Sequence, residues 1–188
     1  MKALLIIDMQ LGSFRPYTLR YDTMAVIGRI NGLSEYFRAQ HDKVIFIQHD
    51  GTKENAFIPG TDDWSLLPEL ARHAGDEVIS KTANDAFYKT ALQSFLEKHN
   101  ITEIFITGCA TDFCIDATVK SALSRDYTIT VVEDAHTTAD RPHMDAPTVI
   151  MHYNWLWADM TPTVSGIIVR KTSEVMDNAH TSMIPSIA

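Results

Sequence analysis

The chain has 188 residues, of which 45% are hydrophobic and 21% are charged, and this composition is that of an ordinary folded domain rather than a disordered protein. Its 16 Lys and Arg against 24 Asp and Glu give a formal net charge of −8, so nucleic acid is not an expected partner. The length fits a single domain, residues 1–188, and we find no repeat, low-complexity tract or linker that would divide it.

The N-terminal segment does not resemble a targeting signal or a membrane anchor. Five apolar residues precede Asp8, which is too short for the apolar region of a signal peptide or for a membrane span. The chain has two Cys, too few for a disulfide scaffold, so a Cys of interest is either catalytic or simply buried. We therefore expect a cytoplasmic protein that does not associate with membranes.

Short apolar segments alternate with longer segments of helical period along the chain. This alternation is typical of parallel strands covered by helices on both faces, and it predicts an α/β fold. The apolar segments are rich in β-branched residues, as the strands of a buried parallel sheet are. Six strands are predicted, at residues 3–7, 43–48, 77–80, 103–107, 128–132 and 166–169.

Four segments have the apolar period of a helix. The first begins at the capping-type residues Asp22 and Thr23, and two others cover residues 87–100 and 113–126. The start of the last helix stays open because Pro142 and Pro147 lie near it. The apolar residues of the first helix are Met24, Ile27, Ile30, Leu33 and Phe37, and those of the last include Val149, Ile150, Tyr153, Leu156 and Trp157.

A long loop is predicted between the second and third strands. Residues 51–68 contain two Pro and two Gly together with several Thr and Asp. Long loops in compact domains tend to shape binding sites, so this loop is expected to border a ligand pocket.

Three reactive side chains follow three different predicted strands. Asp8 and Lys81 come directly after strands, and Cys114 lies at the start of the helix that follows "EIFITGCATDFC". The carboxyl ends of parallel strands form the ligand crevice of such sheets. Each residue alone has an ordinary structural interpretation, as a turn, a solvated amine or a small core residue. Together they supply a base, a cation and a nucleophile, which acyl transfer through a thioester requires.

The segments "LLIIDMQ", "ISK" and "TGCATDFC", in this order and spacing, resemble the isochorismatase-like cysteine hydrolases, which include nicotinamidases and N-carbamoylsarcosine amidase. The resemblance covers essentially the whole chain, including "VVEDAHTT" at residues 131–138. It implies a Rossmann-like three-layer α/β/α fold with a six-stranded parallel sheet of order 3-2-1-4-5-6. It also implies a catalytic triad of Asp8, Lys81 and Cys114 and a cis peptide between Cys109 and Ala110.

The resemblance further implies a mechanism and a class of substrate. Asp8 takes the thiol proton, Cys114 attacks a carbonyl, an amine or ammonia leaves, and water activated by Asp8 hydrolyses the thioester. The backbone N–H groups of Ala110 and Cys114 are expected to form the oxyanion hole. Isochorismatase itself cleaves a vinyl ether without this cysteine, so Cys114 favours an amidase acting on a small amide or ureido compound. A vinyl ether hydrolase and a thiol-based redox protein on the same fold remain the alternatives, and a binding domain without activity ranks below them because the triad is intact.

The charge on the sulfur depends on opposing neighbours. Lys81 and the helix N-terminus favour a thiolate, whereas Asp8, Asp112 and Asp116 disfavour it. For Cys114 to be a useful nucleophile near pH 7, Lys81 has to prevail. We therefore expect the pKa of Cys114 to lie below that of a free thiol. Gln10 and Asp112 are also candidates for orienting groups in the site, although a helix cap is at least as good an interpretation of Asp112.

Six residues are predicted to line the substrate pocket. Aromatic members suggest a flat or apolar small molecule, although Phe87 has core packing as an equally good interpretation. His49 is expected to be a hydrogen-bonded wall of the pocket, and Cys109 a buried and inert thiol. The six are Gln10, Phe14, His49, Trp64, Phe87 and Cys109.

No metal or cofactor is expected. Nicotinamidases carry a metal site of one Asp and several His just after the second strand, whereas this chain has only His49 and Asp50 there. Adjacent residues on an extended chain point in opposite directions, so these two are poor joint ligands. Trp155 and Trp157 are candidates for a subunit contact, because aromatic residues are enriched in interfaces and relatives are commonly oligomers. We therefore expect a homo-oligomer, a dimer or larger.

Overall fold

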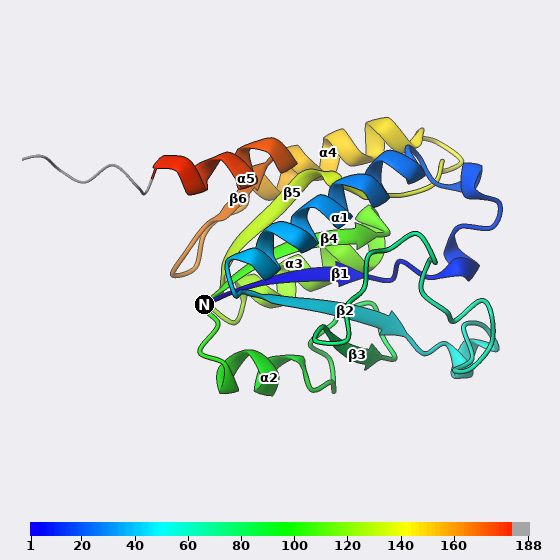
Figure 1. Cartoon of the computed structure of the whole chain (residues 1–188). Helices are drawn as coiled ribbons and strands as arrows, with labels where there is room; N and C mark the ends of the chain where they lie inside the picture. The colour runs from blue at the N-terminus through cyan, green and yellow to red at the C-terminus, as the bar shows by residue number, and fades with distance from the viewer. Residues whose placement is uncertain (182–188) are drawn as a thin grey trace, which may run out of the picture.

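The computed structural model describes residues 1–181 of the protein and shows one open sheet with helices on both faces (Figure 1). The sheet has six strands in the order β3-β2-β1-β4-β5-β6, and every pairing within it is parallel. This confirms the predicted fold class and strand order. The strands are β1 (Lys2–Ile7), β2 (Lys43–His49), β3 (Glu77–Lys81), β4 (Glu103–Cys109), β5 (Thr128–Thr137) and β6 (Ile167–Arg170).

The two faces of the sheet are covered by different helices. On one face, Leu4 and Ile6 of β1 belong to the core beneath α1 (Thr23–Ala39) and α5 (Thr172–Thr181). On the other, Leu5 and Ile7 belong to the core beneath α2 (Leu92–Lys98), α3 (Asp116–Leu123) and α4 (Ala146–Ala158). Successive side chains of a strand point to opposite faces, so a strand buried on both faces is apolar throughout. This explains why "ALLII" does not alternate with polar residues.

The first helix is where its apolar period predicts it, with one difference. Ile27, Ile30, Leu33 and Phe37 are buried, but Met24 is 57% exposed. Val26 is buried in its place and packs in the core under α1. The apolar stripe of α1 therefore begins at Val26 rather than at Met24. Asp22 precedes the helix in a left-handed conformation and makes no side-chain capping bond.

The second predicted helix, 87–100, is shorter in the structure. Lys89 has a φ of 54°, which no residue inside a right-handed helix can have. Thr90 then accepts a bond from the N–H of Leu92, and α2 begins at Leu92. The segment that carries Phe87 is thus irregular.

The third predicted helix, 113–126, is divided into two parts. Residues Thr111–Ile115 form a wide π-helical turn in which the N–H of Ile115 donates to Ala110 O at 3.1 Å, and α3 follows at Asp116. Turns of this kind recur at functional sites. The last of the predicted helices is α4, which begins after Asp145. The carboxylate of Asp145 accepts the N–H of Thr148, and Pro147 occupies the first turn.

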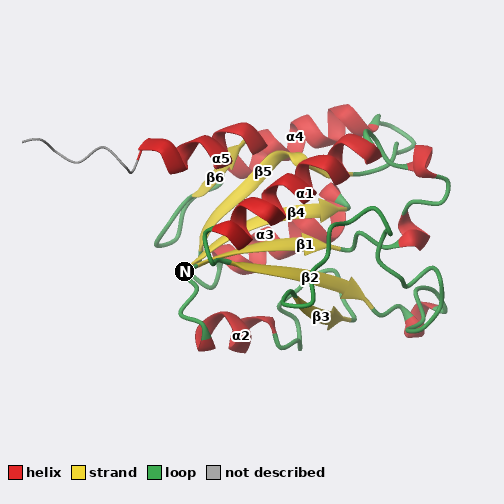
Figure 2. Ribbon diagram, viewed as in Figure 1, coloured by secondary structure: helices red, strands yellow, loops and turns green. Residues whose placement is uncertain are grey.

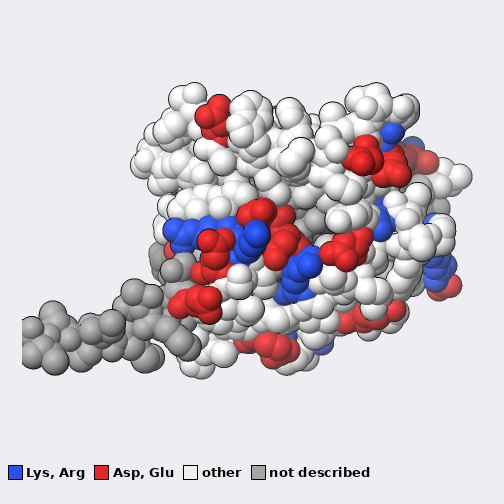
Figure 3. All heavy atoms as spheres, turned by 90° about the horizontal axis from the view of Figure 1, so that it is seen from above, with Lys and Arg blue, Asp and Glu red and all other residues white. Residues whose placement is uncertain are grey.

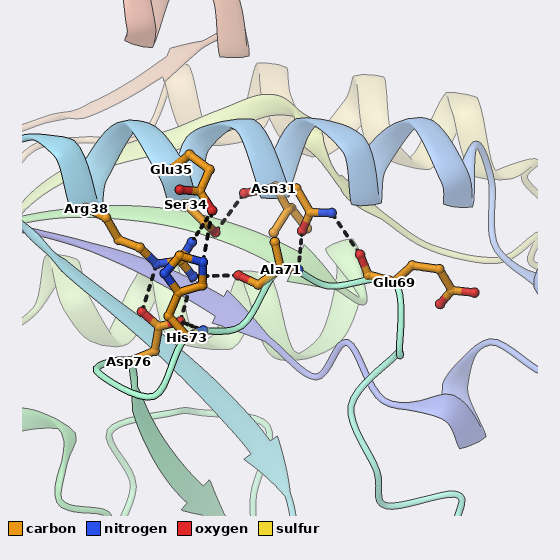
Figure 4. A network of polar contacts seen from close by, with 9 residues as sticks. Asn31, Ser34, Glu35, Arg38, Glu69, Ala71, His73 and Asp76 are labelled. Atoms are coloured by element: carbon orange, nitrogen blue, oxygen red, sulfur yellow. Dashed lines mark hydrogen bonds and ion pairs between the residues drawn. The ribbon is translucent and has the colours of Figure 1, made fainter.

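Loops gather at the carboxyl ends of the strands, at the right in Figure 2. The connection from β1 to α1 contains the short 3₁₀ turns Leu11–Ser13 and Tyr17–Leu19, and the connection from β2 to β3 contains Thr52–Glu54. The end of this second connection is fastened to α1 by polar contacts (Figure 4). Asn31 bonds to the backbone of Glu69 and Ala71, and Arg38 binds Asp76.

The surface seen in Figure 3 carries acidic and basic side chains intermingled, with no large patch of a single sign. Such a face does not resemble the basic surface that nucleic acid binding requires. Within residues 1–181, no helix is both long enough and apolar enough to cross a membrane.

Candidate active site

Asp8, Lys81 and Cys114 meet at the carboxyl end of the sheet. Lys81 Nζ lies 2.7 Å from Asp8 Oδ2 and 3.2 Å from Cys114 Sγ. A third contact, at 2.9 Å, goes to the carbonyl of Ala83, so all three donors of the ammonium group are used. Because β1 lies between β2 and β4 while β3 lies beyond β2, only a long side chain such as that of Lys81 reaches from β3 to this point.

Asp8 and Lys81 form a buried ion pair. Burial raises the pKa of Asp8, and the charge of Lys81 acts against that rise. Burial also opposes the charge of Lys81, but Asp8 and Cys114 outweigh it and raise the pKa of the amine. Asp8 Oδ1 is buried without a hydrogen-bond partner among the described residues, so it has a lone pair available to accept a proton.

The thiol of Cys114 is less acidic than the sequence suggests. Burial and the Asp8 carboxylate raise its pKa above the ordinary value, and Lys81 offsets only part of this. The expectation of a lowered pKa is therefore wrong for the resting site. The reason is that Lys81 is already paired with Asp8 and that the sulfur is buried, which disfavours its charged form.

The backbone before Cys114 has a special shape. Gly108 has a φ of +118°, and a Cβ at that position would overlap the backbone of Ile7, so only glycine fits. The peptide between Cys109 and Ala110 is cis. The N–H groups of Phe113 and Ile115 both donate to Ala110 O, each at 3.1 Å, and Cys114 lies between them in the π-helical turn.

A cavity of roughly 220 Å³ opens beside the sulfur. Of the six predicted wall residues, Gln10, His49 and Cys109 line it. Gln10 holds the end of β2 through both backbone groups of His49, with its Oε1 accepting from the N–H at 2.7 Å and its Nε2 donating to the carbonyl at 3.0 Å. Burial lowers the pKa of His49, which favours the neutral imidazole.

The other three predicted wall residues lie elsewhere, so those predictions are wrong. Phe14 is fully buried in the core beneath α1. Phe87 is buried in the opposite core, where its ring stacks on Tyr127. Trp64 borders a different hollow, and its carbonyl accepts bonds from Gln10 and Gln48. Aromatic residues fill cores as readily as pockets, and the sequence alone does not separate the two.

The cavity has walls that the sequence analysis did not identify. Phe57 comes from the long loop, which was expected to border the pocket, and Phe113 directly precedes Cys114. Asn84 Oδ1 lies 3.6 Å from Cys114 Sγ. Two arginines, Arg20 and Arg141, also line the cavity. Neither directly follows a strand in the sequence, so their positions did not mark them as residues of the site.

Asp112 holds Arg141 in place. Arg141 donates from Nε to Asp112 Oδ2 at 2.6 Å and from Nη2 to Asp112 Oδ1 at 2.8 Å. Thr138 donates to the same carboxylate, and these bonds lower the pKa of Asp112 against the effect of burial. Asp112 thus orients a group of the site, as one of its two interpretations predicted.

His49 and Asp50 diverge. His49 faces the cavity, whereas Asp50 Oδ1 accepts the backbone N–H of Thr52 at 3.0 Å and the Thr52 hydroxyl. Across residues 1–181, no group of three or more His, Cys, Asp or Glu is placed to hold a metal ion.

Trp157 is fully buried and donates its indole N–H to Asp116 Oδ1 at 3.1 Å. A core residue cannot be a subunit contact, so that prediction is wrong for Trp157. Trp155 is 59% exposed, and its place in a contact stays a prediction.

Comparison with known proteins agrees with this geometry. The family model described as "Isochorismatase domain" matches residues 2–161. A solved isochorismatase family protein is 31% identical, with a TM-score of 0.82 over 89% of this chain and 96% of its own. Streptothricin hydrolase of Streptomyces noursei is 28% identical over 75% of this chain and 51% of its own length. Ureidoacrylate amidohydrolase of Yersinia enterocolitica is 37% identical over 39% of this chain and 32% of its own.

The chain spans about half the length of the first curated relatives, 51% and 56% of two streptothricin hydrolases. The family match, in contrast, covers most of this chain, and the strands β1 to β5 and the Gly-Cys-Ala turn before Cys114 lie within it. The chain therefore belongs to the isochorismatase family.

Proposed function

We propose that the protein is a hydrolase that cleaves the C–N bond of a small amide or ureido compound, with Cys114 as the nucleophile. The observation that carries this proposal is the contact of Lys81 Nζ with both Asp8 and Cys114 at the wall of a cavity. The names of two relatives, a hydrolase and an amidohydrolase, support it.

In the first step, the thiol proton of Cys114 moves to Asp8 as the sulfur attacks the substrate carbonyl. The unpartnered Oδ1 of Asp8 is the acceptor, and Lys81 stabilises the negative charge that appears on the sulfur. The S–C bond forms and the carbonyl oxygen takes the negative charge. The N–H groups of Ala110 and Cys114 donate hydrogen bonds to that oxygen. Because the resting thiol is neutral, the thiolate forms only as the attack proceeds.

In the second step, the C–N bond breaks and Asp8 returns its proton to the leaving nitrogen. The amine or ammonia departs and leaves a thioester on Cys114. Water then loses a proton to Asp8 and attacks the thioester, the acid departs, and the proton returns to the sulfur. Formation of the thioester and its hydrolysis each use Asp8 first as a base and then as an acid.

The redox alternative is disfavoured by Cys109. Both cysteines are free thiols, but Cys109 is buried and burial raises its pKa to about 12. Cys109 is also enclosed in the core beneath α1, where a second thiol cannot reach it, whereas Cys114 is partly exposed.

We further propose that residues 1–188 form one domain and that the protein is a cytoplasmic homo-oligomer. Its activity is proposed to need no cofactor.

The test is release of ammonia or amine from a panel of small amides, ureides and hydroxamates. Cys114→Ala should abolish turnover while the circular dichroism spectrum stays unchanged, and Cys109→Ala is the matched control that should remain active. Hydrolysis within a few-fold of wild type in Cys114→Ala would overturn the thioester mechanism and favour direct attack by water, as in vinyl ether hydrolysis.

A further inference from the structure

The charges around the cavity do not cancel. Asp8 is paired with Lys81, and Asp112 is paired with Arg141 through two bonds. These two pairs leave Arg20, which lines the cavity and makes no ion pair with any residue of the described chain. His49 adds no charge, because burial lowers its pKa. A protein with a formal net charge of −8 thus presents one uncompensated positive charge to its pocket.

The position of Arg20 is fixed by its own loop. Its Nε donates to the carbonyl of Ser13 at 2.8 Å, which orients the plane of the guanidinium. The hydroxyl of Thr23 donates to the carbonyls of Arg20 and Tyr17, at 3.0 and 2.8 Å. The next residue, Tyr21, donates its N–H to Thr138 O at 2.9 Å and so ties the loop to the end of β5.

The two terminal nitrogens of Arg20 have no hydrogen-bond partner within residues 1–181. The side chain is only partly exposed and borders the same hollow as the sulfur. The positive charge of Arg20 acts on the buried Cys109 thiol. It opposes the rise in the pKa of Cys109 that burial causes, although burial has the larger effect. The Arg141 guanidinium cannot serve in the same way, since Asp112 neutralises it and it lies 5.0 Å above the Phe113 ring.

We propose that Arg20 binds a carboxylate of the substrate, so that the substrate is a small amide or ureide carrying one carboxylate away from the bond that is cleaved. This inference rests on the proposed function. A planar guanidinium with two free N–H₂ groups matches a carboxylate in shape, and a single negative charge matches the single uncompensated cation. Phe57 and Phe113 supply the apolar walls between the two ends.

The first experiment compares ω-ureido carboxylates with ω-ureido alcohols of the same chain length, with ammonia release as the readout. In wild type, kcat/KM should favour the acid. In Arg20→Gln, the ratio of acid to alcohol should fall by about 10- to 100-fold, as expected when a charge-assisted hydrogen bond is lost. Arg15→Gln is the matched control, since Arg15 is on the same loop and pairs with Asp63 outside the cavity, and it should keep the wild-type ratio.

The second experiment needs no turnover. Cys114 is alkylated with iodoacetamide, followed by mass spectrometry, in the presence of monocarboxylates of three to six carbons or the corresponding primary alcohols. Carboxylates should slow alkylation of wild type, and Arg20→Gln should abolish this protection while Arg15→Gln retains it. Equal thermal melting of the three proteins shows that the variants are folded.

The outcomes separate the two proposals. If the ureides are hydrolysed but the acid-to-alcohol ratio is the same in Arg20→Gln, the carboxylate site is wrong and the hydrolase stands. If no compound is hydrolysed but protection by carboxylates depends on Arg20, the carboxylate site stands and the proposed reaction is wrong. Protection that is equal in wild type and Arg20→Gln overturns the site independently of turnover.

Discussion

At the sulfur of Cys114, two charges act in opposite directions. The Asp8 carboxylate raises the thiol pKa, and the Lys81 ammonium lowers it. Burial, the largest cause, adds to the effect of Asp8, because a thiolate loses its hydration when it is enclosed. The resting site therefore holds its negative charge on Asp8, where Lys81 stabilises it. In the mechanism that we propose, this charge moves to the sulfur only when a substrate is attacked.

This arrangement predicts opposite shifts in two variants. Alkylation of wild-type Cys114 by iodoacetamide should have a midpoint above the value of about 8.5 for a free thiol. Asp8→Asn should move the midpoint down, because a neutral amide no longer repels the thiolate, and Lys81→Met should move it up, each by about one unit or more. The measurement is the alkylation rate from pH 6 to 10 by mass spectrometry.

Asp50→Asn is the control for this series, since it removes a carboxylate that faces Thr52 rather than the sulfur. Its midpoint should equal that of wild type. A wild-type midpoint below that of a free thiol, or the same midpoint in Asp8→Asn, would show that burial and Asp8 do not govern the sulfur.

Activity should not depend on a metal ion. His49 faces the cavity while Asp50 is bound to Thr52, so the two do not converge on one ion. Prolonged treatment with a chelator, followed by elemental analysis, should leave the rate unchanged. About one zinc, iron or manganese per chain, with activity lost on its removal and restored on its return, would contradict this.

Among the elements, α1 and the long connection to β3 are joined by a compact polar cluster (Figure 4). Arg38 donates from Nε and Nη2 to the two oxygens of Asp76, at 3.0 and 2.6 Å, and Nη2 also reaches Ala71 O. The side chains of Arg38 and Asp76 are only 15% and 4% exposed, so neither partner is well hydrated. The cluster fixes the end of a connection whose earlier part carries Phe57 to the cavity.

We expect Arg38→Met to destabilise the fold by about 2 kcal/mol, because it leaves the nearly buried carboxylate of Asp76 without its partner. For a domain of this size the loss corresponds to a decrease in Tm of roughly 4–8 °C. Glu35→Gln is the control, since Glu35 is an exposed partner of the same arginine and should contribute less than about 1 kcal/mol. Urea unfolding of the three proteins checks the prediction, and equal stability of Arg38→Met and wild type would refute it.

The elements that were predicted well are those whose pattern of apolar residues follows from burial, either within the sheet or against it. All six strands and the turns of α1 that carry Ile27 to Phe37 follow this rule. The elements that were predicted poorly depend on single backbone conformations. Lys89 at a positive φ shortens α2, and the π-helical turn at Thr111–Ile115 delays α3. These backbone conformations cannot be predicted from the residue types, because Lys and Thr both occur in ordinary helices.

For the whole molecule, the sheet topology explains which parts of the site were predictable. In a parallel sheet the strand ends meet at one edge, so Asp8, Lys81 and Cys114 were expected together. The walls of the cavity come instead from loops, whose paths are set by tertiary contacts such as that of Tyr21 with Thr138. Periodicity says nothing about these paths, which is why Arg20 was missed and Phe14 was misplaced.

One buried histidine connects the active-site turn, the sheet and α4. His136 of β5 lies 2.9 Å from Thr111 Oγ1 through Nδ1 and 2.9 Å from Asn154 Oδ1 through Nε2. Asn154 Nδ2 donates to Glu133 O, so its Oδ1 is an acceptor. It follows that Nε2 of His136 carries the hydrogen and that Nδ1 accepts from the Thr111 hydroxyl. The imidazole is thus held neutral, with both nitrogens used.

This predicts how the stability of the whole protein depends on pH. Burial lowers the pKa of His136 to about 4, whereas an unfolded histidine titrates near 6.5. Above about pH 6.5 both states are neutral at this residue and its contribution is complete. As the pH falls from about 6.5 to 4, the unfolded state binds a proton that the folded state refuses, so up to about 3 kcal/mol of stability is lost.

The measurement is urea unfolding of wild type and His136→Gln between pH 7.5 and 4.5. The variant should be less stable at pH 7.5, because the amide does not reproduce both hydrogen bonds, but its stability should fall less steeply toward pH 4.5. The difference between the two slopes isolates His136 from the other seven of the eight histidines, which titrate in both proteins. Parallel slopes would mean that His136 is protonated in the folded state near its ordinary pKa, and the network that joins Thr111 to Asn154 would then have a different proton arrangement from the one derived above.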